Sequence, residues 1–313
     1  MTSAEAFRHC YVNVTTYGNH VPEYSNLLAA VSDEYQLIYR NIPKSASSTG
    51  RHVIQDFMEG EDRRLSHDDL INLVNEEGYQ LISFVREPLN RFYSSYDEAF
   101  FRIGPWMGDG DIVRDKPRVR KWYHNNKHKM DKYPYLYEGM RTLDDFRAMY
   151  CPSKILRMKN PLKCNDVPSI DDGNLAHRFE QFVRDYNGLD PFDVHLNLQV
   201  SNLVFGVTGE PLPVSVLYNA SDAEREWREI AKVREVEIND GDITHARKIS
   251  RRFNVDMVSK ETKRKICKIL ALDYCCLNLE LPEVCRIDNE EDVNGVYCRM
   301  KEVDGKVIIE DWR

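Results

Sequence analysis

The segment from Gln36 to Arg51 constrains the fold of this chain more than any other part of the sequence. An apolar run ends at Ile42, Lys44 follows one proline later, and small hydroxyl residues then lead into a helical pattern. This order is typical of a strand, a loop and a helix in which N–H groups, hydroxyls and one ammonium converge on a phosphate-like anion. Taken alone, the segment also fits a Ser- and Thr-rich turn that only caps a helix.

The loop differs from the GxxxxGK[ST] nucleotide-binding loop, because no glycines precede its lysine. We expect Lys44 to place its charge on the transferring group, and the hydroxyl and N–H groups at the helix start to bind the anion. The candidate ligands in this loop are Pro43, Lys44, Ser45, Ala46, Ser47, Ser48 and Thr49.

A second apolar run ends at Arg86, and the helical pattern after it carries Ser94. A guanidinium donates in a bidentate manner and the serine adds a hydroxyl, so the two can share a second phosphate. Both motifs follow strands, where open α/β sheets bind ligands. The alternative is that Arg86 and Arg91 form surface ion pairs with Glu87 or Asp97, but two such motifs in this order favour a ligand with two phosphates.

The alternation of strands and helices predicts an α/β fold with a mostly parallel central sheet and helices on both faces. The buried strands are expected at 36–42 and 81–85, and the tail from Val296 to Trp312 predicts a β-hairpin around Asp304-Gly305. We find no repeat or linker and expect one domain over residues 1–313. Further helices are expected at 142–150, at 174–186 and from Ser66, Ser221 and Ser259.

Composition narrows the class of protein. The hydrophobic share of 42% and charged share of 30% are those of a globular protein. The net charge of −8 argues against general nucleic-acid binding, which needs a basic surface. No apolar stretch is long enough to span a membrane, and the first ten residues lack the order of a signal peptide.

The eight cysteines contain no CxxC pair, which argues against a zinc or thioredoxin-like site. Their even number fits either free buried thiols or a few disulfides, and the pairing stays open. Two sequons, at Asn13 and Asn219, favour a glycoprotein of the secretory pathway. No cluster of His, Cys and Asp has the spacing of metal ligands, so we expect no metal.

The two motifs together resemble the cofactor motifs of Golgi carbohydrate sulfotransferases, especially heparan and uronyl O-sulfotransferases. The run from Ile42 to Thr49 is similar to their 5′-phosphosulfate loop. The run from Val85 to Ser94 is similar to their 3′-phosphate motif, with Glu87 where Asp is usual. This match covers residues 36–102, the predicted cofactor-binding core. Shorter similarities to the end of such enzymes are Leu272-Asp273-Tyr274 and Leu281-Pro282-Glu283-Val284-Cys285.

The resemblance implies a P-loop-like three-layer fold. It also implies transfer of sulfate from 3′-phosphoadenylyl sulfate (PAPS), which leaves adenosine 3′,5′-bisphosphate, to a hydroxyl, with a carbohydrate as the expected acceptor. The expected compartment is the Golgi lumen if an N-terminal anchor has been removed, and the cytoplasm otherwise. Two other functions stay open: a P-loop-type kinase of a small molecule, and a non-catalytic module that binds anionic glycans.

In the heparan enzymes, the general base is a histidine between the two motifs, and His52 and His67 are the histidines in that interval here. We prefer His67, because the first position of a helix favours a neutral imidazole that can accept a proton. His52 is expected to have a packing or supporting role. His195 is the alternative base, so the catalytic candidates are Lys44, His67 and His195.

Residues 103–140 interrupt the α/β pattern and mix basic with aromatic side chains, including a basic stretch from Arg114 to Lys132. Aromatic rings stack on sugar faces and cations meet carboxylate or sulfate groups, so this acceptor-side insertion is predicted to bind an anionic or sugar acceptor. The alternative is a solvated loop. The candidate acceptor ligands are Arg118, Lys121, Trp122 and His124, and further candidates for the 3′-phosphate are Arg251 and Arg252.

Overall fold

The computed structural model of the chain describes residues 2–8, 10–12, 27–102, 128–129, 131–137, 172–189, 193–239, 241–243, 254–286, 299–303 and 306–311. Its contacts divide the chain into two compact units. The first contains Met1–Arg91, Gly188–Arg247 and Cys267–Arg313, and the second contains Phe92–Asn187 and Lys248–Ile266. The single domain expected from the sequence stays a prediction, and the helix expected at 142–150 lies outside the described residues.

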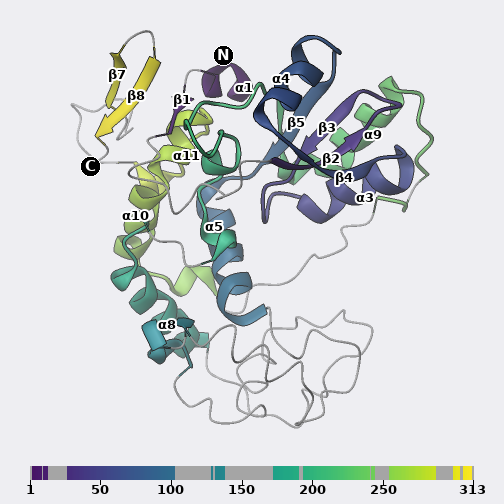
Figure 1. Cartoon of the computed structure of the whole chain (residues 1–313). Coiled ribbons are helices and arrows are strands. Elements are labelled where there is room, and N and C mark those ends of the chain that lie inside the picture. The colour runs from purple at the N-terminus through teal and green to yellow at the C-terminus, as the bar shows by residue number, and fades with distance from the viewer. Residues whose placement is uncertain are drawn as a thin grey trace. The chain divides into compact units, whose positions relative to one another are not determined.

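A five-stranded sheet forms the centre of the first unit (Figure 1). The three strands β3 (Leu37–Arg40), β5 (Gln80–Val85) and β6 (Val216–Asn219) are parallel neighbours, as the alternation of strands and helices predicted. Strand β2 is antiparallel to both β3 and β4, so the sheet is mixed and β2 alone in it runs against the other four. In spatial order the strands are β4 (Glu61–Leu65), β2 (Leu27–Ser32), β3 (Leu37–Arg40), β5 (Gln80–Val85) and β6 (Val216–Asn219).

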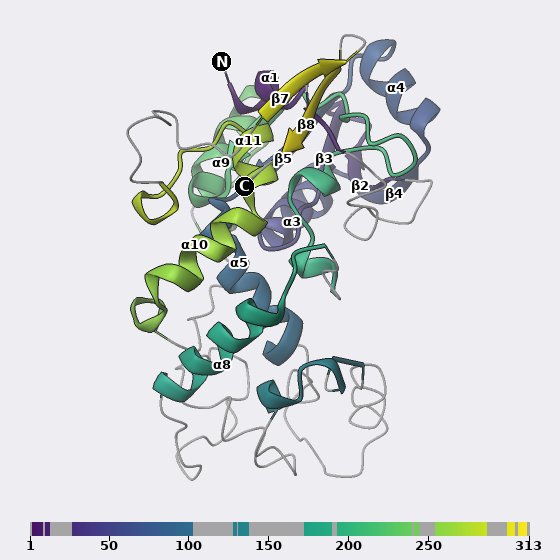
Figure 2. The same ribbon diagram turned by 90° about the vertical axis from the view of Figure 1, so that its left-hand side faces the viewer.

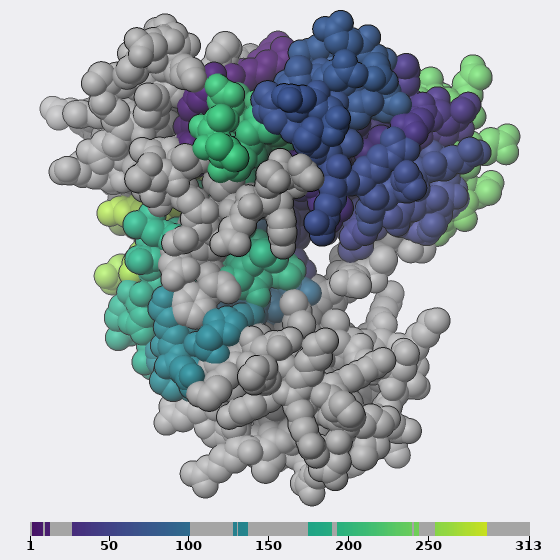
Figure 3. Space-filling model, viewed as in Figure 1, coloured from purple at the N-terminus to yellow at the C-terminus, as the bar shows by residue number. Residues whose placement is uncertain are grey.

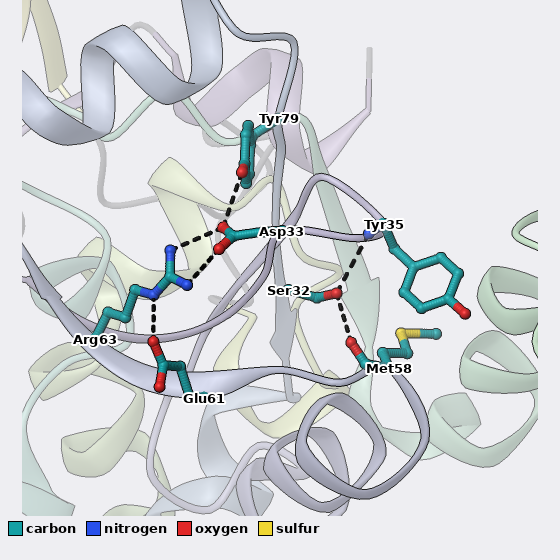
Figure 4. Close-up of polar contacts among 7 residues, drawn as sticks. All are labelled: Ser32, Asp33, Tyr35, Met58, Glu61, Arg63 and Tyr79. Carbon is teal, nitrogen blue, oxygen red and sulfur yellow. Dashed lines mark hydrogen bonds and ion pairs between the residues drawn. The ribbon is translucent and has the colours of Figure 1, made fainter.

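The edge strand β4 is almost entirely charged, and a polar cluster fixes it to the turn after β2 (Figure 4). Arg63 donates to both carboxylate oxygens of Asp33, and its Nε donates to Glu61 over 2.9 Å. The hydroxyl of Tyr79 donates to the same Asp33 carboxylate over 2.8 Å. Charged side chains on an edge strand discourage pairing with other chains. The same charges hide β4 from a search for apolar alternation, which explains why the sequence analysis missed it.

Helices α3 (Ser47–Phe57) and α9 (Ala223–Val233) cover one face of the sheet. The buried ring of Tyr39 on β3 meets Trp227 of α9 edge-on, with ring centroids 5.4 Å apart. Helix α3 approaches the same ring so closely that a Cβ at Gly50 would collide with it. This close packing of helix on strand fixes where the first turn of α3 lies relative to the end of β3.

On the opposite face of the sheet, the 3₁₀ turn η8 (Val200–Asn202) lies against β3, and helix α11 (Ala271–Cys276) contacts this turn. Arg40 points to this side from β3, and its Nε donates to the carbonyl of Asn202 over 2.7 Å. Burial lowers the pKa of Arg40 to about 10. Other described helices of this unit are α1 (Ser3–Phe7) and α4 (His67–Asn75), and described 3₁₀ turns include η7 (Val194–Leu196), η8 (Val200–Asn202), η9 (Ala220–Asp222) and η11 (Glu283–Cys285).

The expected C-terminal hairpin is present as β7 (Arg299–Val303) and β8 (Lys306–Asp311), which pair in antiparallel fashion. Strand β8 also pairs in parallel with β1 (Cys10–Tyr11), so segments from both ends of the chain lie side by side (Figure 2). Two disulfides join parts of this unit, Cys10–Cys276 and Cys267–Cys285, with Cα atoms 5.5 and 5.6 Å apart. The cysteines that the structure describes are therefore disulfide-bonded rather than free.

The second unit is built on aromatic side chains. Helix α5 (Pro88–Asp97) continues into it and ends in a π-helical turn, Glu98–Arg102. There the ring of Tyr96 meets Phe179 of α8 with centroids 4.8 Å apart. Lys129, from the predicted acceptor-side insertion, is buried and donates to the carbonyl of Ala99 over 2.7 Å, so it supports the core instead of facing a ligand. Other described elements with residues in this unit include η4 (Pro134–Tyr137), α8 (Asp172–Asp185), η10 (Val255–Met257) and α10 (Lys260–Ile269).

Candidate active site

The loop between β3 and α3 makes a tight turn with an unusual backbone. The N–H of Ser45 donates to the carbonyl of Ile42 over 3.1 Å, which places Pro43 and Lys44 at the centre of the turn. Lys44 has φ +67° and Ala46 has φ +58°, the left-handed region that glycine normally occupies. Each such residue costs about 1–3 kcal/mol, and backbone strain of this kind concentrates at functional sites.

Helix α3 begins directly after this strained loop. Ala46 is its N-cap residue, and because an alanine has no side-chain acceptor, it cannot cap the N–H groups of the first turn. The side chain of Ser48 is exposed there, that of Ser47 is half-buried, and that of Thr49 is buried. Free N–H groups at the positive end of a helix dipole are a binding site for an anion, as the sequence predicts for this loop.

Helix α5, which follows the neighbouring strand β5, begins in the opposite way. The carboxylate of Glu87 accepts from the N–H groups of Leu89 and Asn90 over 2.9 and 2.7 Å, so this helix carries its own anionic cap. The hydroxyl of Tyr274 on α11 donates to Glu87, and burial together with that carboxylate raises the pKa of the tyrosine. Glu87 therefore holds α5 in place and is not a ligand of a second anion.

Arg86 lies between these two helix starts. Its Nη1 donates to the carbonyl of Lys44 over 3.5 Å, so the ends of β3 and β5 bring two cationic residues into neighbouring loops. Ser94 is half-buried in the second turn of α5. The candidate residues Arg118, Lys121, Trp122, His124, Arg251 and Arg252 lie outside the described residues.

Gln199 hydrogen-bonds to both loops, the one after β3 and the one after β5. Its Oε1 accepts from the Ser45 hydroxyl over 3.0 Å and from the Arg86 N–H over 2.8 Å, and its Nε2 donates to the Arg86 carbonyl over 2.8 Å. Ser45 and Gln199 have no exposed surface. The Ser45 hydroxyl therefore supports the loop from inside, although the sequence analysis listed this residue among the anion ligands.

Arg91 is a second buried connection. Its Nε donates to the carbonyl of Pro43 over 2.9 Å, and its Nη1 and Nη2 donate to the carbonyls of Asn197 and His195 over 2.8 and 3.4 Å. The side chain is only 1% exposed, which excludes the alternative of a surface ion pair for Arg91. The guanidinium thus holds the turn before α3 against the segment that carries His195.

The two candidate bases differ in their surroundings. His67 is the first residue of α4, whose capping box of Ser66 and Asp69 confirms the sequence prediction. Its Nδ1 lies 3.1 Å from the almost fully exposed Asp68, and its ring packs on Phe205 with centroids 4.1 Å apart. Figure 3 shows α4, in blue, beside the green segment that contains Phe205 on the surface.

The sheet register relates His67 to the anion loop. Asp62 of β4 and Tyr39 of β3 both pair with Ala30 of β2, and His67 and Lys44 each come five residues after those partners. Strands β4 and β3 run in the same direction with β2 between them. Both residues therefore lie just beyond the same end of the strands. The two strands are about 10 Å apart.

His195 is held more tightly than His67. Its Nδ1 lies 2.6 Å from Oδ1 of Asp193, and the side chains of the pair are 21% and 11% exposed. This is the arrangement of a base whose tautomer and orientation are set by a carboxylate. His52, for which a packing or supporting role is predicted, pairs with Asp56 through Nδ1, and its Nε2 lies 3.3 Å from the carbonyl of Asp242.

Sequence reasoning gave Gln199, Arg91 and Asp193 no role in the site. The Asp-x-His spacing of Asp193 and His195 is a signal that was available. Gln199 offers none, because an amide far along the chain has no local pattern. Among the described residues, no group of three or more His, Cys, Asp or Glu side chains is arranged to hold a metal ion, and no helix is long and apolar enough to cross a membrane.

Comparison with models of known protein families identifies the family of this chain. The family model described as "Sulfotransferase family" matches residues 28–278, which is more than half of the chain and includes both loops, α4 and Gln199. No curated protein and no solved structure matches the chain.

Proposed function

The chain belongs to the sulfotransferase family, and on that premise we propose that it transfers the sulfuryl group of PAPS to a hydroxyl of a carbohydrate acceptor. The contact between Arg86 Nη1 and the Lys44 carbonyl carries this proposal. It joins an uncapped helix start to a strand end with a guanidinium, and PAPS has a phosphosulfate at its 5′ end and a phosphate at its 3′ end. The resemblance of both loops to the motifs of carbohydrate sulfotransferases supports the same donor.

In this proposal the loop of Lys44 binds the 5′-phosphosulfate. The ammonium of Lys44 stabilises the negative charge that develops on the bridging oxygen as the nucleotide leaves, while the N–H groups of Ser47, Ser48 and Thr49 bind the phosphosulfate oxygens. Arg86 and Ser94 bind the 3′-phosphate. Sulfuryl transfer resembles phosphoryl transfer, in which positioning and charge stabilisation dominate.

We assign the general base to His67. The acceptor oxygen forms a bond to sulfur while its proton passes to the imidazole, and the bond from sulfur to the nucleotide oxygen breaks with its electron pair. His67 and Lys44 both follow the same end of the strands, and this supports the assignment. The contact of His195 Nδ1 with the Asp193 carboxylate supports His195 as the second candidate.

Substitution of each histidine by glutamine separates the two candidates. We expect His67→Gln to lower kcat by about 10²–10⁴-fold, the usual contribution of a general base, with unchanged binding of adenosine 3′,5′-bisphosphate. We expect His195→Gln to lower kcat by less than about tenfold. The reverse result assigns the base to His195, with Asp193 as its orienting carboxylate.

The acceptor is the finer part of the proposal. The basic and aromatic side chains Arg118, Lys121, Trp122 and His124 remain the predicted acceptor ligands, and Arg251 and Arg252 remain predicted ligands of the 3′-phosphate. The disulfides Cys10–Cys276 and Cys267–Cys285 support an oxidising compartment such as the Golgi lumen.

Two measurements test the function. Thermal unfolding with adenosine 3′,5′-bisphosphate, the nucleotide that PAPS leaves, and with ATP shows which nucleotide the protein prefers. A ligand at 100 times its Kd stabilises the fold by about 2.7 kcal/mol. A transfer assay with radiolabelled PAPS and a panel of polysaccharides then tests catalysis. A preference for ATP supports the small-molecule kinase instead, and bisphosphate binding without transfer to any polysaccharide supports a glycan-binding module.

A further inference from the structure

One buried amide joins the two loops that the proposed function assigns to the donor. Gln199 makes one hydrogen bond to the side chain of Ser45 and two to the backbone of Arg86, all between 2.8 and 3.0 Å. These partners lie 154 and 113 residues from Gln199 in the sequence. A single side chain therefore bridges the loop that follows β3 and the loop that follows β5.

The backbone of Gln199 is fixed from the other side. Its N–H donates to Oδ2 of Asp273 over 3.0 Å, and the N–H of Val200 donates to Oδ1 over 3.0 Å. Asp273 belongs to α11 and has no exposed surface. Because Gln199, Ser45 and Asp273 are fully buried and hydrogen-bonded, the amide has little freedom to turn or shift.

The geometry points to Gln199 as a positioning residue that sets the separation of the 5′-phosphosulfate and 3′-phosphate sites. This inference rests on the proposed function, since it requires a donor with an anion at each end. Gln199 acts through Ser45 and Arg86 and has no contact of its own with the donor. When two sites are held at a fixed separation, the second anion of a ligand binds as an intramolecular event. Loss of that fixed separation weakens a ligand with two anions more than a ligand with one.

Calorimetric titration measures this effect as the affinities of three nucleotides: adenosine 3′,5′-bisphosphate, adenosine 5′-monophosphate and adenosine 3′-monophosphate. Gln199→Met keeps the length of the side chain and removes the amide, and Ser45→Ala removes one of its three hydrogen bonds. We expect the bisphosphate to bind about tenfold more weakly to Gln199→Met and about threefold more weakly to Ser45→Ala, while each monophosphate changes by less than about twofold.

Ser32→Ala is the matched control. Ser32 is also fully buried, and its hydroxyl donates to the carbonyl of Met58 over 2.5 Å, away from both loops. We expect it to leave the affinities of all three nucleotides unchanged. If Gln199→Met does not fold, Ser45→Ala, which keeps both bonds to Arg86, gives the answer.

The outcomes separate this inference from the proposed function. Equal weakening of all three nucleotides indicates a general structural role and overturns the inference, as does unchanged bisphosphate binding in both variants. A wild-type protein that prefers the bisphosphate, with variants that keep this preference, overturns the role of Gln199 alone. A wild-type protein that binds the bisphosphate no more tightly than the monophosphates overturns both.

Discussion

Two helices that begin in the first unit follow neighbouring parallel strands and begin in opposite ways. Helix α3 starts after a left-handed alanine that cannot cap it, whereas α5 starts with the carboxylate of Glu87 on two of its N–H groups. The positive end of α5 is thus already neutralised within the protein, and that of α3 is left for a ligand. The difference indicates that the 5′ anion is bound largely by backbone, and that the second anion depends on side chains such as Arg86.

The two loops also differ in backbone strain, which is present in the loop before α3 and absent from the loop before α5. Lys44 and Ala46 both have positive φ, and no residue from Val85 to Pro88 does. Buried hydrogen bonds from Arg91 to Pro43 and from Ser45 to Gln199 hold the strained loop in its conformation. The loop is therefore shaped before a ligand arrives, which reduces the ordering cost of binding.

Among the substitutions that test this contrast between the two loops, the largest expected effect is at Lys44. We expect Lys44→Ala and Lys44→Gly each to lower kcat by about 10²–10³-fold, the usual cost of removing one transition-state charge donor. Lys44→Gly differs from Lys44→Ala in stability, because glycine adopts φ +67° without strain. We expect it to be more stable by about 1 kcal/mol, as measured by urea unfolding. Equal stability of the two variants would show that this position carries no strain, and retained turnover would exclude Lys44 from the reaction.

The capped helix predicts the next largest effect. Glu87→Ala removes the cap of α5 and leaves the buried hydroxyl of Tyr274 without its acceptor, so we expect a loss of about 2 kcal/mol in the free energy of unfolding. Glu87→Asp keeps the carboxylate, as in the motif that the sequence resembles, and is expected to lose less than about 0.5 kcal/mol. Urea unfolding measures both. If Glu87→Ala is as stable as Glu87→Asp, the carboxylate does not act as a cap.

The features that the sequence predicted are those with local signals. The end of β3, the lysine after Pro43 and the capping box at Ser66 are readable because neighbouring residues determine them. The hairpin of β7 and β8 was readable from alternation around a turn. Strand β2 was not predicted, because its residues, LLAAVS, show no alternation of apolar and polar side chains. The strands that pair with it lie elsewhere in the chain.

The support of the site was not predictable in this way. Gln199 and Arg91 act over more than 100 residues of sequence, through contacts to backbone carbonyls and N–H groups that any residue type offers. Such contacts leave no pattern of residue types near either partner. The sequence therefore indicates which side chains meet a ligand more readily than which side chains hold those loops in place.

A smaller effect tests whether the start of α3 is open to anions. Ala46→Asp adds a carboxylate beside the uncapped N–H groups, and we expect it to raise the KM for PAPS about tenfold through like-charge repulsion. Ala46→Asn has nearly the same shape without the charge and is the matched control, with an expected change below about threefold. Equal KM values for the two variants would mean that the anion binds elsewhere.

The smallest effect concerns charges at the opposite edge of the sheet, where the turn after β2 carries Asp33. Hydrogen bonds from Arg63 and Tyr79 lower the pKa of Asp33 below its ordinary value of 3.8, so the folded state favours the ionised carboxylate. Its contribution to stability is present above the unfolded pKa and is lost as the pH falls through the folded one. The group is largely exposed and screened by solvent, so we expect Asp33→Asn to cost less than about 0.5 kcal/mol at pH 7. In acid unfolding experiments that difference should shrink as the pH falls below 3.8, while the KM for PAPS stays at the wild-type value. A changed KM would mean that charges far from the start of α3 also influence the donor, and that the contrast between the open and the capped helix is not local.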